Sequence, residues 1–230
     1  MSDAAVTPVV VVGNAPMERD AVTRLLGAAH KPGAVTVGVD GGAKQLLALG
    51  ILPNVVTGDF DSLSEGDLNY LGASGATIVP TPDQNYTDFD KALSWVRETY
   101  PDPVIAVFGA TGGRLDHSYS VLSAIIKHGV SGGADICLVD ATGETRPVRG
   151  GELLIQSDDL PGRVLSLLAF GVVRRLTLTG VRWTLTGETI APGVRDGTLN
   201  EIVGHEVCLH CEPGAPLLVQ VHHAPLLRGR

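Results

Sequence analysis

The sequence is poor in several features that mark common classes of protein. It has three cysteines, Cys137, Cys208 and Cys211, in 230 residues, too few for a disulfide framework. No apolar run approaches the length of about 20 residues that a membrane-spanning helix needs. Residues 1–5 lack the basic stretch and following apolar stretch of a signal peptide. These absences predict a cytoplasmic protein with no membrane partner.

Basic residues are also scarce. The chain has 17 Lys and Arg against 25 Asp and Glu, which gives a formal net charge of −8 at pH 7. Because nucleic acids bind to basic surfaces, no DNA or RNA partner is expected. The sequence has no P-loop of the form G-x-x-x-x-G-K-[ST] and no G-x-G-x-x-G motif after its first strand-like run. Common ATPases and nicotinamide dehydrogenases are therefore not expected either.

Acidic residues, in contrast, crowd two short stretches. One reads Gly-Asp-Phe-Asp-Ser over residues 58–62, and the other contains Asp83, Asp88 and Asp90. Like charges this close repel each other, and a hard cation bound through carboxylate oxygens removes the repulsion. Mg²⁺ usually takes one or two carboxylates together with substrate phosphates. The two stretches therefore predict a metal-assisted site for a phosphorylated ligand.

The first part of the chain alternates strand-like and helix-like segments. Short apolar runs predict strands at residues 9–12, 35–39, 55–57, 77–79, 104–108 and 136–139. Helices are expected at residues 43–49, from Ser64, from an N-cap at Thr87 to about Thr99, and at residues 117–128. This alternation predicts an α/β domain, residues 1–145, with a mostly parallel sheet flanked by helices.

The pattern changes near residue 142. Strand-like runs follow at residues 164–170, 176–179, 206–209 and 217–221, with turn residues between them and no convincing amphipathic helix. We therefore expect a small C-terminal all-β sandwich domain over residues 146–230. Its expected role is to supply part of an acceptor pocket or of a dimer interface.

Chemically reactive residues fall at the carboxyl ends of the expected strands, where open α/β sheets bind ligands. Asp59 and Asp61 lie two apart on an extended segment, so they face the same side and can share one cation. Asp88 falls in the first turn of its helix, where the dipole also favours a phosphate, and Lys91 on the same face can reach a phosphate oxygen. Asp90 points off that face and is expected at the solvated surface. Each motif alone is more often a turn or a cap, but their joint occurrence at one edge favours a site.

These residues make the chain similar to the thiamine pyrophosphokinase family, whose members move a pyrophosphoryl group from ATP to the hydroxyl group of thiamine. The resemblance covers nearly the full length. The motifs that carry it are Val-Asp-Gly-Gly-Ala at residues 39–43, Gly-Asp-Phe-Asp-Ser at 58–62, Thr-Pro-Asp-Gln-Asn-Tyr-Thr-Asp-Phe-Asp-Lys at 81–91, Gly-Gly-Arg-Leu-Asp-His at 112–117, and more loosely Gly-Val-Arg-Trp-Thr-Leu at 180–185 and Thr-Leu-Asn-Glu at 198–201. Where the family has an adjacent Ser-Asn pair, Leu199 here separates Thr198 from Asn200.

The resemblance implies the members of each site. Asp59, Asp61 and Asp88 would hold Mg²⁺, and Lys91 would contact the transferring phosphates. The ATP site would consist of Asp40, Gly41, Gly42, Thr87, Gly109, Thr111, Gly112, Gly113 and Arg114. The thiamine site would consist of Gln84, Asp116, His117, Trp183, Thr198 and Asn200. The resemblance also implies a homodimer, with thiamine bound between the catalytic domain of one subunit and the sandwich of the other.

Three other functions fit parts of the sequence. A glycosyltransferase could use Asp59 and Asp61 to chelate a metal on a nucleotide sugar. A pyrophosphokinase for a pterin alcohol would share the mechanism and differ in the acceptor pocket. A non-catalytic thiamine-binding protein would leave the carboxylate cluster without a purpose. Trp183 likewise has two interpretations, a ring that stacks on a cationic heterocycle or a core residue of the sandwich.

Overall fold

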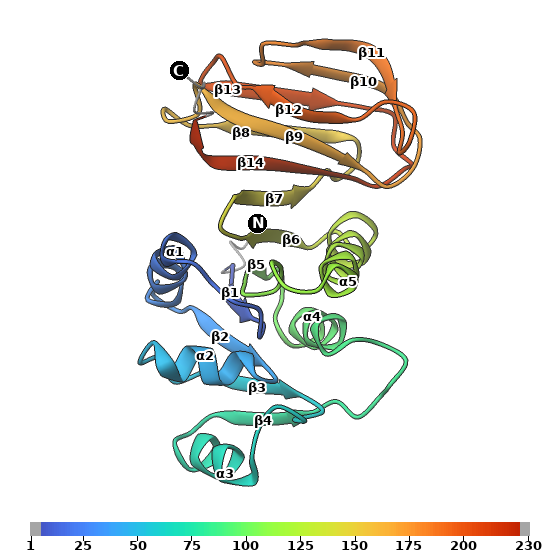
Figure 1. The fold of residues 1–230 in the computed structure, drawn as a ribbon. Helices are drawn as coiled ribbons and strands as arrows, with labels where there is room; N and C mark the ends of the chain where they lie inside the picture. Colours follow the sequence, from blue (N-terminus) through green and yellow to red (C-terminus); the bar gives the residue numbers. More distant parts are fainter. Residues whose placement is uncertain (1–5, 226–230) are drawn as a thin grey trace, which may run out of the picture. The chain divides into compact units, whose positions relative to one another are not determined.

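The computed structural model describes residues 6–225, and the chain divides into two units (Figure 1). The first unit runs up to His128 and includes Ala134–Ala141, whereas the second consists of Gly129–Gly133 and the chain from Thr142 onward. Among the described residues, no helix combines the length and hydrophobicity needed to cross a lipid bilayer.

The first unit is built on a parallel sheet with the spatial order β6-β5-β1-β2-β3-β4. Every adjacent pair in this order is parallel. The strands are β1 (Pro8–Val12), β2 (Val35–Val39), β3 (Val55–Gly58), β4 (Thr77–Pro80), β5 (Val104–Phe108) and β6 (Asp135–Val139). The strands expected from the sequence are therefore confirmed, each to within a residue at either end.

Helices cover both faces of this sheet, with α1 and α2 on one side and α4 and α5 on the other (Figure 1). The helices are α1 (Arg19–Ala29), α2 (Gly42–Ala48), α3 (Glu65–Ala73), α4 (Asp88–Thr99) and α5 (Leu115–Ile125). Because both faces are covered, Val9, Val10, Val11 and Val12 of β1 are all buried. That double burial is why β1 reads as an unbroken apolar run.

The expected helix starts at Ser64 and Thr87 are confirmed. Thr87 is the N-cap of α4, and its Oγ1 accepts a hydrogen bond from the backbone N–H of Asp90 at 3.3 Å. Ser64 forms a capping box with Asp67 at the start of α3. The prediction of one helix over residues 117–128 is wrong in detail. The α-helix starts two residues earlier and ends at Ile125, and a π-helical turn, Ile126–Ser131, follows.

The order of the strands creates a topological switch point. From β1 the chain builds β2, β3 and β4 outward on one side, and then returns to place β5 on the other side of β1. The connections that leave β1 and β5 lead to helices on opposite faces of the sheet, α1 and α5, so a crevice opens at the carboxyl ends of these strands, the place where doubly wound sheets bind ligands.

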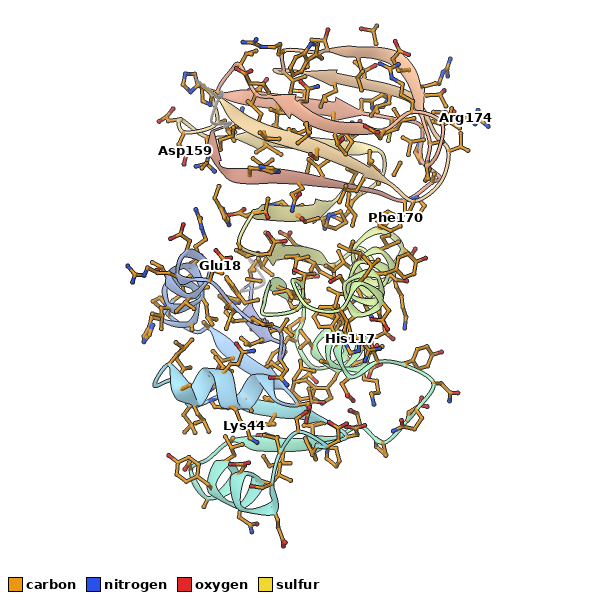
Figure 2. The ribbon with its side chains drawn as sticks, viewed as in Figure 1. Glu18, Lys44, His117, Asp159, Phe170 and Arg174 are labelled. Atoms are coloured by element: carbon orange, nitrogen blue, oxygen red, sulfur yellow. The ribbon has the colours of Figure 1, made fainter. Side chains whose placement is uncertain are left out.

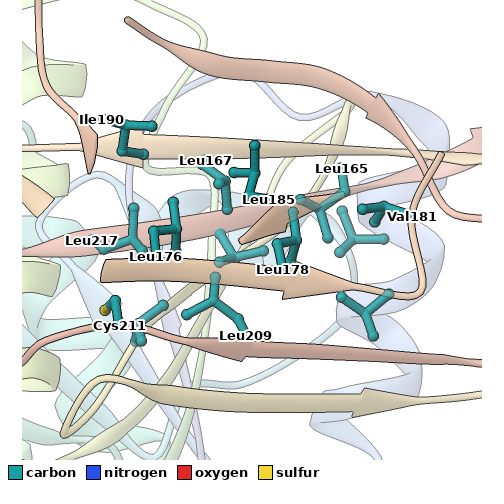
Figure 3. Close-up of a cluster of buried hydrophobic side chains, with 14 of the residues drawn as sticks. Leu165, Leu167, Leu176, Leu178, Val181, Leu185, Ile190, Leu209, Cys211 and Leu217 are labelled. Carbon is teal, nitrogen blue, oxygen red and sulfur yellow. The ribbon is translucent and has the colours of Figure 1, made fainter. Parts of the chain in front are cut away.

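The second unit is a sandwich of two antiparallel sheets, as expected from the sequence. One sheet has the order β12-β9-β14-β7 and the other β11-β10-β13-β8. The strands are β7 (Gly143–Pro147), β8 (Glu152–Gln156), β9 (Arg163–Ala169), β10 (Val173–Thr179), β11 (Leu185–Ile190), β12 (Gly197–Glu201), β13 (Glu206–His210) and β14 (Leu217–Pro225). Side chains of both sheets share one apolar core, among them Leu165, Leu176, Leu209 and Leu217 (Figure 3).

Gly42, the first residue of α2, provides a test of how tightly α2 packs on β1. A Cβ built on Gly42 would lie 2.0 Å from the carbonyl oxygen of Val12, so Gly42→Ala should destabilise the protein by about 1–3 kcal/mol. The control is Gly27→Ala in α1, where a Cβ meets nothing within 4 Å and a gain of about 0.5–1 kcal/mol is expected. Urea unfolding measures both. Equal effects of the two substitutions would contradict this packing.

Candidate active site

A pocket of about 690 Å³ opens at the β1–β5 switch point, and all the residues that line it belong to the first unit. Eleven of its lining residues are ones that the sequence nominates for a site: Asp40, Asp59, Gln84, Thr87, Asp88, Lys91, Gly109, Gly113, Arg114, Asp116 and His117. Other nominated residues of this unit, Gly41, Gly42, Asp61, Thr111 and Gly112, do not line it. Residues from four separate motifs thus meet in one place.

The loops that follow β1 and β5 form one wall of the pocket and are joined by backbone hydrogen bonds. Gly13 N–H donates to Phe108 O at 2.9 Å, and Ala15 N–H donates to Gly109 O at 2.7 Å. The two loops approach each other so closely that a Cβ on Gly13 would lie 2.6 Å from Gly109 O. The lining residues Gly13 and Asn14 were not nominated from the sequence. The Gly-Asn pair that ends the first strand was the available signal.

Three carboxylates gather at the ends of β2 and β3. Oxygens of Asp40, Asp59 and Asp61 all lie within 4.8 Å of one another. Asp40 Oδ1 accepts a hydrogen bond from Ser62 N–H at 3.2 Å, and Asp61 Oδ1 accepts one from Ser62 Oγ at 3.0 Å. Lys44 extends from α2 (Figure 2), and its Nζ donates to the carbonyl oxygen of Ser62 at 2.7 Å and so holds this loop. The group is an oxygen-rich site of the kind that a hard cation binds.

Asp88 lies outside this group and is paired with Lys91 at the start of α4. Lys91 Nζ lies 2.7 Å from Asp88 Oδ1, and it also donates to the carbonyl oxygens of Thr81 at 2.5 Å and Asp83 at 2.9 Å. The ion pair aside, Asp88 Oδ1 is buried and accepts no hydrogen bond from the described residues. Asp88 and Asp59 line the same pocket, so a ligand there can meet both.

Arg114, Asp116 and His117 lie where α5 begins. Arg114 donates to both carboxylate oxygens of Asp116, from Nε at 3.1 Å and from Nη2 at 2.5 Å, and the backbone N–H of His117 donates to Oδ1 at 3.0 Å. The hydrogen bond from Arg114 is the main reason that the pKa of Asp116 is held at about 2. This carboxylate is therefore ionised at any physiological pH.

The nominated residues of the second unit are arranged around an exposed tryptophan. Trp183 is 57% exposed, so it is not a core residue of the sandwich. Asn200 is only 7% exposed; its Nδ2 donates to Trp183 O at 2.8 Å and its Oδ1 accepts from Trp183 N–H at 3.1 Å. Thr198 Oγ1 donates to Asp196 at 3.0 Å. The amide of Asn200 is therefore engaged in holding the backbone of Trp183.

The expectation that Asp90 lies at the solvated surface is wrong. Asp90 is 7% exposed, and both of its carboxylate oxygens have partners. Oδ2 accepts from Lys127 Nζ at 2.6 Å, and Oδ1 lies 2.9 Å from His128 Nε2. Helical periodicity showed that Asp90 is off the face of Asp88, but the π-helical turn packs against the face that it does occupy.

The fold and the pocket define a class of protein, in which an α/β unit with an acidic pocket at a switch point is followed by a β-sandwich. Comparison with known proteins narrows the class. The sequence profile "Thiamin pyrophosphokinase, catalytic domain" matches residues 29–138, and "Thiamin pyrophosphokinase, vitamin B1 binding domain" matches residues 152–214. Thiamine pyrophosphokinase of Bacillus subtilis (strain 168) is 35% identical over 169 residues, which cover 73% of this chain and 78% of that protein.

Solved structures agree with the sequence comparison. A crystal structure of thiamine pyrophosphokinase from Bacillus subtilis superposes with a TM-score of 0.80 at 28% identity, over 95% of this chain and 100% of that one. Thiamin pyrophosphokinase from Geobacillus thermodenitrificans gives 0.77 at 26% identity, over 93% and 97%. The chain belongs to the thiamine pyrophosphokinase family. The resemblance inferred from its motifs is confirmed, and the glycosyltransferase and pterin alternatives are not favoured.

The buried His128 predicts a pH dependence of stability. Burial lowers its pKa, and Lys127 and Arg97 act in the same direction, while Asp90 opposes them. As the pH falls below about 6.5, the unfolded chain takes up a proton that the folded His128 does not yet bind, so stability decreases until the lower folded pKa is passed. His128→Gln removes this pH-dependent contribution to the free energy of unfolding. The difference in unfolding free energy between wild type and variant should shrink from pH 7.5 to pH 5.5 in urea titrations, whereas a constant difference would contradict the assignment.

Proposed function

We propose that this chain transfers the pyrophosphoryl group of ATP to thiamine, giving thiamine diphosphate and AMP. The observation that carries the proposal is the pocket at the β1–β5 switch point, where the carboxylates, Lys91 and the start of α4 converge in a member of this family. In the reaction, the hydroxyl oxygen of thiamine attacks the β-phosphorus of ATP. The bond from that phosphorus to the oxygen of the α-phosphate breaks, AMP leaves with that oxygen, and the hydroxyl proton is released.

Binding of Mg²⁺ is part of the proposal. Asp59, Asp61 and Asp88 would hold the ion, and the closeness of Asp40 to the first two supports its inclusion. Three carboxylate oxygens within 4.8 Å of one another, without a cationic side chain paired to them in the described chain, fit a hard cation. A bound Mg²⁺ would neutralise negative charge on the phosphate oxygens.

Lys91 is proposed to neutralise charge on the transferring group. Its side chain is 10% exposed, and its ammonium is fixed by contacts with Asp88, Thr81 and Asp83, so it does not have to be ordered when ATP binds. The N-terminus of α4 beside it favours anions through its dipole. Transfer of phosphoryl-type groups depends mainly on positioning and charge neutralisation of this kind.

Residues that line the pocket, together with neighbours in the same motifs that do not line it, are proposed to bind ATP and thiamine. The turn of Asp40, Gly41 and Gly42 and the loop from Gly109 to Gly113 would contact ATP, with Thr87, Thr111 and Arg114. Gln84, Asp116 and His117 would contact thiamine, and the permanently ionised Asp116 suits the amino group of its pyrimidine ring.

A homodimer is proposed in which the sandwich of one subunit completes the thiamine site of the other. The exposed ring of Trp183 supports this, because it is held at the surface of the sandwich with Arg182 stacked 5.8 Å from its centre. Trp183, Thr198 and Asn200 would belong to that surface, with Asn200 acting through the backbone of Trp183. Location in the cytoplasm stays a prediction from the sequence.

An acceptor screen tests the proposed reaction directly. With ATP and Mg²⁺, AMP should form with thiamine and not with a hydroxymethylpterin or a sugar. Asp59→Asn and Asp61→Asn should each lower turnover by at least about 100-fold, since losing a charged metal ligand costs several kcal/mol of transition-state stabilisation. Asp20→Asn, an exposed carboxylate of α1, is the matched control. Near-normal turnover of Asp59→Asn or Asp61→Asn at saturating Mg²⁺ would remove that residue from the metal site.

A second test concerns Trp183. If its ring stacks on the cationic thiazolium of thiamine, Trp183→Ala removes a cation–π contact worth ~0.5–2 kcal/mol, so the KM for thiamine should rise about 2- to 30-fold. The KM for ATP should change little. Trp183→Phe, which keeps an aromatic face, should lie between wild type and Trp183→Ala in steady-state assays. An unchanged thiamine KM in a folded Trp183→Ala variant would exclude the stacking role.

A further inference from the structure

A chain of charged contacts links the buried Asp90 to the wall of the pocket. Lys127 Nζ lies 2.6 Å from Asp90 Oδ2, and the same ammonium sits 4.4 Å from the centre of the Tyr86 ring. Tyr86 lines the pocket, whereas Asp90 and Lys127 do not. The contacts thus run from the first turn of α4, through the π-helical turn, to the loop that precedes α4.

Asp90 is fixed more firmly than an ordinary surface carboxylate. Its other oxygen lies 2.9 Å from His128 Nε2, and His128 Nδ1 lies 3.3 Å from Arg97 Nη1. With Arg97 donating to Nδ1, Nε2 carries the proton and donates to Asp90. A neutral His128 leaves Lys127 as the cation that directly contacts the buried carboxylate, and a buried charge without a partner is strongly unfavourable. Lys127 is therefore held in place by Asp90 and cannot swing away as a free surface lysine does.

Tyr86, in contrast, has little else to hold it. Its residue is 56% exposed, and residues 83–86 are all exposed. The ammonium of Lys127 over its ring is an attractive cation–π contact. At the beginning of the loop, Lys91 donates hydrogen bonds to the carbonyl oxygens of Thr81 and Asp83. Lys91 thus secures the beginning of the loop, and Lys127 secures its end.

We infer that Lys127, anchored by Asp90, is a positioning residue that holds Tyr86 and with it the 83–86 loop against the pocket. The inference rests on the proposed function, because the loop carries Gln84 and leads directly into Thr87 and Asp88. Because the loop is already held in the free protein, less conformational entropy is lost when the substrate binds.

The test uses variants at each end of the cation–π contact in the full-length protein. Asp90→Asn is the obvious choice, but it can prevent folding, so Lys127 is the better target because its side chain is 48% exposed. Lys127→Met keeps the length of the side chain and removes the charge, and Lys127→Arg keeps the charge. Tyr86→Leu removes the ring, and Tyr86→Phe keeps it. Lys31→Met, at an exposed lysine outside the pocket, is the matched control.

Two readouts are measured on each variant: hydrogen exchange of the peptide that spans residues 81–87, and kcat/KM for ATP with thiamine. Lys127→Met and Tyr86→Leu should each speed exchange in this peptide and lower kcat/KM about 2- to 5-fold, the range that the loss of one exposed cation–π contact allows. The double variant should be no worse than either single one, because both remove the same contact. Lys127→Arg should restore slow exchange and activity, Tyr86→Phe should keep slow exchange, and Lys31→Met should match wild type.

The inference is overturned if Lys127→Met lowers the melting temperature but leaves loop exchange and kcat/KM unchanged, because the contact would then be only structural. Additive effects in the double variant would overturn it as well. Failure of the proposed function looks different. Wild type would not turn over thiamine, while the exchange pattern of the variants would still show whether Lys127 holds the loop.

Discussion

Neutralisation of carboxylates at one edge of the parallel sheet is the constraint on which the site depends. Because the strands are parallel, their carboxyl ends meet, and acidic residues distant in the sequence are brought together. Asp88 and Asp116 each pair with a basic side chain within three residues in the sequence. In the described part of the chain, no cationic side chain pairs with Asp40, Asp59 or Asp61. The fold thus neutralises some of the charge internally and leaves one group of carboxylates whose repulsion a bound cation would relieve.

The same basic residues that neutralise charge also order the backbone around the pocket. Lys91 joins Asp88 to two carbonyl oxygens of the preceding loop, and Lys44 holds the carbonyl oxygen of Ser62 beside the carboxylate group. Arg114 makes a two-pronged contact with the carboxylate at the start of α5. An acidic pocket of this kind would be costly to assemble around a substrate from mobile loops. Preorganisation by local ion pairs leaves more of the binding energy for the ligand.

Local signals in the sequence located most elements of the first unit. Most of what was missed depends on contacts between segments that lie far apart in the sequence. Ser64 and Thr87 mark helix starts because capping involves only residues within one turn. The helix α1 was not expected, since it lacks a start signal of this kind: Glu18 at its N-cap makes no side-chain capping hydrogen bond. Asp90 was misjudged because periodicity does not reveal which element covers a face. Gly13 and Asn14 line the pocket only because β5 returns beside β1, and strand order is not encoded in any one segment.

Both units hold an exposed aromatic side chain by means of a buried polar one. In the first, Asp90 fixes the ammonium that lies over Tyr86. In the second, the buried amide of Asn200 brackets the backbone of Trp183, and the neighbouring Leu199 adopts a φ of 61°, a conformation that a residue with a side chain rarely takes. An exposed ring loses entropy when a ligand orders it. A buried hydrogen bond that fixes its backbone or its neighbour makes the chain lose part of this entropy when it folds rather than when the ligand binds. The favourable packing of the core then offsets the loss.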